Sequence, residues 1–143
     1  MKKKVFLGFI VTFLALVVLD NLGDAVLFKS SMASLSNMMR PKAEMQENML
    51  IILVSFLVFA FCFSWIFSKG YQGKGIFEGI RYGVAVGLMF NVPHFYINYA
   101  MMPFPLSFTL PVFLYWMLIF VISGILVAWV FGMKSKDQAQ AQA

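Results

Sequence analysis

The sequence predicts an all-α, polytopic membrane protein with four transmembrane helices in an antiparallel bundle. Of its 143 residues, 62% are apolar and only 12% are charged, whereas about a quarter to a third of a soluble domain's surface is charged. The apolar residues form four long, continuous runs, and the lysines and arginines are unevenly distributed among the segments between them. These observations exclude collagens, coiled coils, disordered chains and nucleic-acid-binding domains, so no nucleic acid is expected as a partner.

The four spans are expected at about residues 5–28, 49–67, 76–99 and 111–132 of a single domain that covers 1–136. A helix needs about 20 mainly apolar residues to cross the hydrocarbon of a bilayer. The first run is too long for the apolar part of a typical signal peptide, so we expect it to remain uncleaved. The fourth is expected to begin at Pro111, because proline is favoured at the first helical position. Residues 137–143 have no apolar face and are expected to form a disordered tail.

The distribution of positive charge predicts the orientation of these spans. Cationic side chains resist translocation and stay on the cytoplasmic side. With the N-terminus inside, the cytoplasmic set is Lys2, Lys3, Lys4, Lys69, Lys74, Arg81, Lys134 and Lys136, against Lys29, Arg40 and Lys42 outside. We therefore expect both termini to be cytoplasmic.

A stripe of glycines enters the third span. Gly79, Gly83 and Gly87 follow Gly75 at intervals of four residues, which places them along one line of an α-helix. In lipid, small residues let helix backbones approach closely, so this line is expected to pack against another helix. That helix can belong to the same bundle, to a second copy or to a partner protein, and a pore-lining role is a further alternative. One case considered within the bundle is that the first span fills this groove.

A second pattern is polar and lies in the outer half of two spans. Asp20 and Asp24 share one face of the first span, while Asn91, His94 and Asn98 share one face of the third. At a rise of about 1.5 Å per residue the two sets lie at matching depths. A charged group inside a membrane costs about 2.5–3.5 kcal/mol on insertion scales, so we expect these five residues to meet.

Such a cluster allows three interpretations. A carboxylate beside an imidazole can exchange a proton near neutral pH, as proton-coupled transport requires. The two acids and the histidine can instead bind a divalent cation whose coordination shell is completed by water. Hydrogen bonds that only fix the helix register are the third. No dedicated metal site is expected.

Enzymatic activity is not expected. The sequence contains no Walker loop, HExxH motif or Ser-x-x-Lys motif, and no soluble domain to carry them. Its single cysteine, Cys62, excludes an intrachain disulfide and a redox pair. Several methionines near the outer connections are soft ligands suited to Cu(I), but their spacing is not diagnostic. We therefore expect no cofactor.

One combination of motifs resembles a known group of proteins. Leu19-Asp20 lies in the first span, Arg81-Tyr82-Gly83 in the glycine-spaced third span, and Trp116 in the fourth after a proline-rich turn. This layout resembles small bacterial inner-membrane proteins of four helices, to which no biochemical activity is assigned. The resemblance implies a multi-pass location in the bacterial inner membrane. Small multidrug transporters are similar in size and also carry an acid in the first span, but that acid is typically a glutamate.

Two functions follow from these patterns. The first is a structural or assembly role, in which the glycine stripe binds a partner transmembrane helix or a second copy. The alternative is a small transporter coupled to protons or cations, which uses the cluster of Asp20, Asp24, Asn91, His94 and Asn98. In both, the lipid bilayer is the common partner.

Overall fold

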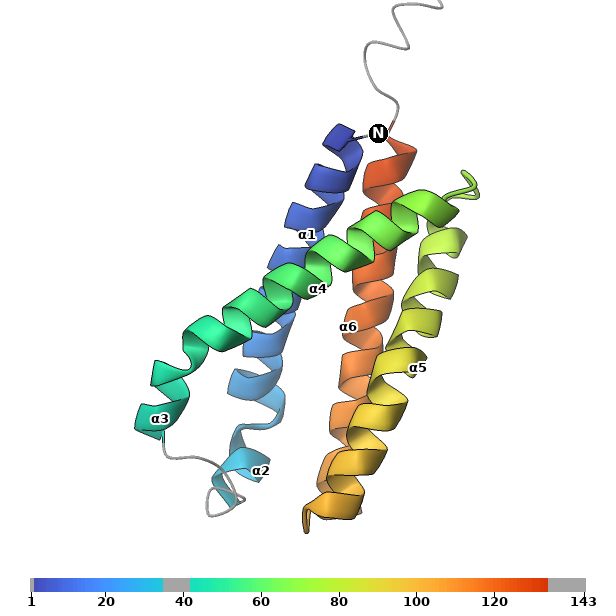
Figure 1. Ribbon diagram of the computed structural model, residues 1–143. Helices are drawn as coiled ribbons and strands as arrows, with labels where there is room; N and C mark the ends of the chain where they lie inside the picture. The colour runs from blue at the N-terminus through green and yellow to red at the C-terminus, as the bar shows by residue number, and fades with distance from the viewer. Residues whose placement is uncertain (1, 35–41, 134–143) are drawn as a thin grey trace, which may run out of the picture.

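The computed structural model describes residues 2–34 and 42–133, and these residues form helices joined by short turns, without a strand (Figure 1). The prediction of an all-α protein is confirmed for this part of the chain. The predicted tail at 137–143, together with Arg40, Lys134 and Lys136, lies outside the described residues. The elements are α1 (Lys2–Leu22), η1 (Gly23–Leu27), α2 (Lys29–Ser34), α3 (Lys42–Glu47), α4 (Met49–Gly70), α5 (Ile76–Met101) and α6 (Leu106–Gly132).

Three segments are long and apolar enough to cross a membrane. They are Lys2–Leu27, which joins α1 to the π-helical turn η1, then α4 and α6. Helix α5 has 26 residues, but it is not among these candidates, and polar side chains such as Asn91, His94 and Asn98 interrupt its apolar sequence. The structure therefore supports a membrane protein with three candidate spans.

The start of α6 differs from the prediction. The helix begins at Leu106, five residues before Pro111, and Pro111 lies inside it. Pro105 has an extended backbone at the N-cap, and its carbonyl accepts hydrogen bonds from the backbone N–H groups of Phe108 and Thr109, at 3.0 and 3.1 Å. Since a proline removes only its own N–H from the ladder, the apolar residues before Pro111 extend the helix.

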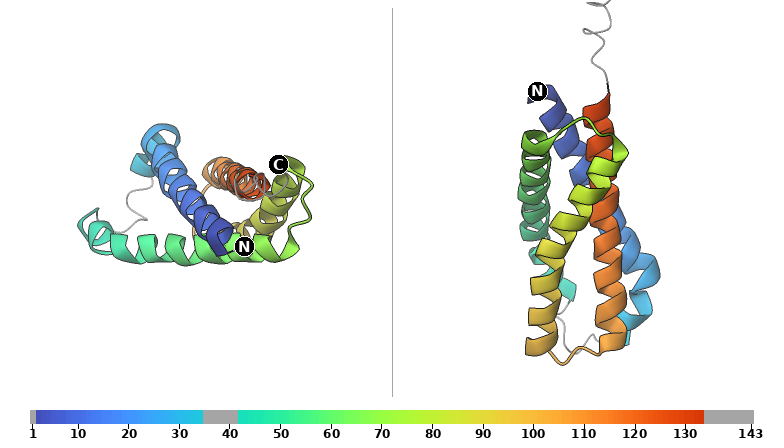
Figure 2. Two further views of the ribbon diagram at one scale, coloured as in Figure 1. Left: turned by 90° about the horizontal axis from the view of Figure 1, so that it is seen from above. Right: turned by 90° about the vertical axis from the view of Figure 1, so that its right-hand side faces the viewer.

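Helix α6 is the central helix, with α5 packed on it along one side and α1 packed on it along another. Helices α5 and α6 run antiparallel and side by side, joined by the turn at 102–105 (Figures 1 and 2). Helix α1 packs against α4 and α6, but not along α5. Helix α4 crosses in front of α1 and α6 obliquely (Figure 1). The start of α1 and the end of α6 lie at the same end of the molecule (Figure 1).

Helices α1 and α5 begin at this end, and α4 ends there. It is called the basic end because of its cationic residues, which are Lys2, Lys3, Lys4, Lys69, Lys74 and Arg81. The opposite end, which holds the α5–α6 turn and α2, is called the turn end (Figure 1). The Nζ of Lys4 donates a 2.8 Å hydrogen bond to the carbonyl of Phe131 in the last turn of α6. This bond ties the first helix to the last.

The core lies mainly toward the basic end. Rings from α4, α5 and α6 stack there, with Phe63 and Tyr82 only 4.6 Å apart between centroids. The Tyr82 hydroxyl donates a 2.8 Å hydrogen bond to the carbonyl of Phe63, which joins α5 to α4. All buried side chains of α4 occur from Ala60 onward. The other half of α4, toward the turn end, therefore has no buried side chain.

Candidate functional site

The glycine stripe lies in the α5–α6 interface, where Gly79, Gly83 and Gly87 are buried. A Cβ atom added at Gly79 would overlap the carbonyl oxygen of Gly124, and one added at Gly83 would overlap the carbonyl oxygen of Phe120. Only glycine permits such a close approach of two helix backbones. Helix α6 thus covers the stripe from Gly79 to Gly87, whereas Gly75 precedes α5 and is exposed.

The first span does not fill this groove, because α6 occupies it. Helix α6 carries its own small residues, Gly124 and Ala128, at a spacing of four, and both lie against Gly79. A turn of only four residues, 102–105, makes α5 and α6 antiparallel neighbours. Helix α1 has no comparable row of glycines, and α6 lies between α1 and α5 (Figures 1 and 2).

Asp20 continues the buried face of α1. Gly8, Thr12 and Leu16 are buried at intervals of four residues, and the half-buried Asp20 is the next residue in this series. Asp24 follows after four more residues but is exposed. The first acid therefore points toward the neighbouring helices, and the second lies at the edge of the same face.

Tyr115 of α6 docks against the π-helical turn that contains Asp24. Its hydroxyl donates a hydrogen bond to the carbonyl of Leu19, and its ring lies directly on Gly23, where a Cβ would overlap it. The ring of Phe28 is 5.5 Å away in an edge-to-face arrangement. A carbonyl in the last turn of α1, directly before the π-helical turn, thus accepts a hydrogen bond from a side chain of another helix. No local sequence pattern indicated this contact beyond an aromatic residue at a similar depth.

The polar residues of α5 form a separate group. The amide nitrogen of Asn98 lies 3.1 Å from Nε2 of the exposed His94. Asn91 is 4% exposed, and its amide nitrogen has no hydrogen-bond partner among the residues that the structure describes. Within the described residues, no hydrogen bond or ion pair joins this group to Asp20 or Asp24. The predicted meeting of the five residues is therefore not found, because α1 and α5 pack on α6 instead of on each other.

Two buried hydroxyls occur in the middle of the α1–α6 contact. Leu16 and Ile119 pack together with Ala60 of α4, and Thr12 and Ser123 lie one helical turn closer to the basic end. In the described part of the chain, the hydroxyl oxygens of both residues are buried without a hydrogen-bond partner. Leu16, at 1% exposure, therefore separates these hydroxyls from Asp20.

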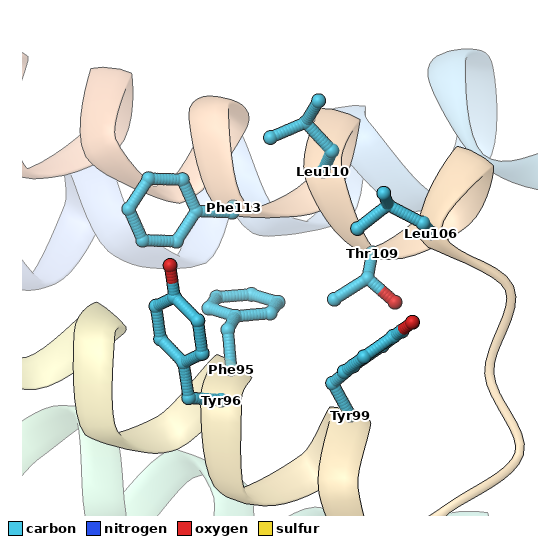
Figure 3. A pocket seen from close by; sticks show the side chains of 7 residues that line it. All are labelled: Phe95, Tyr96, Tyr99, Leu106, Thr109, Leu110 and Phe113. Carbon is cyan, nitrogen blue, oxygen red and sulfur yellow. The ribbon is translucent and has the colours of Figure 1, made fainter.

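An aromatic recess of about 260 Å³ lies between α5 and α6 near the turn end (Figure 3). Phe95, Tyr96 and Tyr99 come from α5, and they face side chains of α6 that include Thr109 and Phe113. Thr109 directs its hydroxyl to the carbonyl of Pro105, at 3.2 Å. The walls are mainly apolar, so the recess suits hydrocarbon rather than a charged solute.

No known family model matches the chain, and neither a curated protein nor a solved structure matches it. A function is therefore proposed below from the contacts, the burial and the charges of its own residues.

Proposed function

We propose that the chain is a four-span protein of the bacterial inner membrane, with both ends of the chain in the cytoplasm. Helix α5 packs along α6, which is apolar enough to cross a bilayer. We therefore infer that α5 crosses the same bilayer beside α6, which brings the number of spans to four. Helices partnered in this way tolerate polar residues on their protein-facing side. The basic end carries the clustered lysines and Arg81, and such clusters remain on the cytoplasmic side.

Within the membrane, we infer a structural or assembly role through contact with another transmembrane helix. The observation that carries this proposal is the half of α4 at residues 49–58, which is apolar and has no buried side chain. The glycine stripe is already covered by α6, so a partner helix or a second copy binds α4 instead. No catalytic activity is part of this proposal.

Photo-crosslinking in cell membranes tests this role. A photoreactive amino acid replaces Val54 of α4, and a matched variant replaces Leu118 of α6, since the two side chains are 49% and 53% exposed. We expect the Val54 variant to form a protein–protein adduct and the Leu118 variant to form lipid adducts only. The mass of the protein adduct identifies a second copy or a different chain. Lipid adducts alone from both positions would contradict the assembly role.

A second candidate function is a small proton- or cation-coupled transporter, in which the chemistry of Asp20 carries the activity. It is favoured by the position of this carboxylate on the buried face of α1, in line with the unpaired hydroxyls of Thr12 and Ser123. Leu16, which packs with Ala60 and Ile119, interrupts this line. His94 and Asn98 lie outside that line, on α5.

Flux measurements in proteoliposomes separate the two candidates. A transporter shows pH-driven flux that Asp20→Asn abolishes, that Asp24→Asn reduces less because Asp24 is exposed, and that Leu16→Ala increases. Absence of flux from the wild-type protein, with correct folding, would reject transport and leave the assembly role.

A further inference from the structure

A recess of about 440 Å³ lies between α1 and α4 at the basic end. Lys2 of α1 and Lys69 of α4 line it, together with Phe6, Phe9, Phe61 and Trp65. Among the described residues, 2–34 and 42–133, no acidic side chain lines it. The recess therefore combines two positive charges with aromatic walls.

The charges and the rings are arranged in the same order along both helices. On α1, Lys2 is followed by Phe6 and Phe9 after one and two turns toward the turn end. On the antiparallel α4, Lys69 is preceded by Trp65 and Phe61 at the corresponding spacing. Each wall is thus cationic at the membrane boundary and apolar farther into the membrane.

Contacts of aromatic rings join the two walls of this recess and hold one of its lysines in place. Phe9 and Phe61 approach edge to face, with centroids 6.3 Å apart, and join the two walls. The Nζ of Lys69 lies 5.7 Å from the centre of the Trp65 ring, which holds the ammonium group beside the apolar wall. Phe6 is 62% exposed and Trp65 is 49% exposed, so the protein itself leaves these faces accessible.

We propose that this recess binds one anionic phospholipid. The phosphate of the headgroup contacts Lys2 and Lys69, and an acyl chain lies along Phe6, Phe61 and Trp65. A zwitterionic headgroup fits less well, because its own cation would be repelled by the two lysines. The proposal rests on the membrane placement argued above, but not on the assembly or transport role.

Native mass spectrometry of the full chain in detergent tests this site with phosphatidylglycerol and phosphatidylcholine as probes. The test variant is Lys2→Gln with Lys69→Gln, and the charge-matched control is Lys3→Gln with Lys74→Gln, at the same end but outside the recess. A lysine near an anionic lipid surface contributes roughly a fivefold change in affinity. We therefore expect the affinity of the test variant for phosphatidylglycerol to fall by about tenfold or more, while the affinity of the control stays close to that of the wild type.

Two further measurements make the result specific. Phe61→Ala leaves the charge unchanged and is expected to shorten lipid retention, with circular dichroism confirming that the helices remain. Inorganic phosphate is expected to compete poorly, because it lacks an acyl chain. Equal losses in the two lysine variants, equal retention of both lipids, or full competition by phosphate would each overturn the proposal. None of these results depends on whether α4 binds another helix.

Discussion

Gly79 of α5 and Gly124 of α6 face each other with no side chain between their backbones. A Cβ added to either glycine would overlap the carbonyl oxygen of the other. Lipid tails are as apolar as leucine, so membrane helices gain little from hydrophobic burial and depend on close packing. This contact, with Gly83 against Phe120 one turn away, fixes α5 on α6.

Replacing Gly83 with leucine is therefore expected to disrupt the bundle. The new side chain would displace the backbone at Phe120 and Val121, which lowers the free energy of unfolding by about 3 kcal/mol or more. Ala85→Leu is the matched control, because Ala85 is exposed on the same helix. Thermal denaturation in detergent measures both. Equal melting temperatures for the two variants would show that α5 and α6 are not docked in this way.

Tyr115→Phe tests the link between α6 and the π-helical turn. Loss of the hydroxyl removes the hydrogen bond to the Leu19 carbonyl and is expected to lower stability by about 0.5–1.5 kcal/mol. Backbone amides at 19–27 should then exchange faster with deuterium. Tyr96→Phe, at a residue that is 70% exposed, should leave both measurements unchanged. Unaltered exchange in the Tyr115 variant would contradict the contact.

Lys4→Gln probes the hydrogen bond between the first turn of α1 and the last turn of α6. The Lys4 ammonium group donates to the Phe131 carbonyl in the last turn of α6, where a positive charge also interacts favourably with the helix dipole. We expect a loss of about 0.3–1 kcal/mol and faster exchange in the last turn of α6. Lys3→Gln removes the same charge from an exposed neighbour. Similar effects of the two substitutions would point to net charge rather than to this bond.

Asn91→Leu is expected to stabilise the protein. The Asn91 side chain is buried and its amide nitrogen lacks a partner, and an unsatisfied buried polar group costs about 1–3 kcal/mol. Leucine has a similar length and no polar atoms. Asn98→Leu serves as the contrast, because Asn98 contacts His94. A lower melting temperature for the Asn91 variant would mean that the amide has a partner in the membrane, such as a bound water.

The sequence was sufficient to predict an all-α protein, because a long apolar segment in lipid has few alternatives to a helix. It indicated that the third span has a face for close packing, but not which helix occupies it. The matching pair Gly124 and Ala128, with the short turn before α6, was the signal that identifies the occupant. The Tyr115–Leu19 bond joins residues 96 positions apart, and the same distant ring lies on Gly23 of the π-helical turn, so no local pattern could indicate this contact. The oblique path of α4 was equally hidden, since a helix that is apolar on every side does not indicate which face is buried.

Cysteine labelling in intact bacteria tests the central claim, that α5 crosses the membrane beside α6 with the basic end in the cytoplasm. In a Cys62→Ser background, which removes the only native cysteine, single cysteines replace Gln72 before α5 and Met102 after it, both exposed. A membrane-impermeant maleimide should label position 102 in intact cells and position 72 only after permeabilisation. Labelling of both positions from the same side would show that α5 does not cross, and would contradict the four-span account.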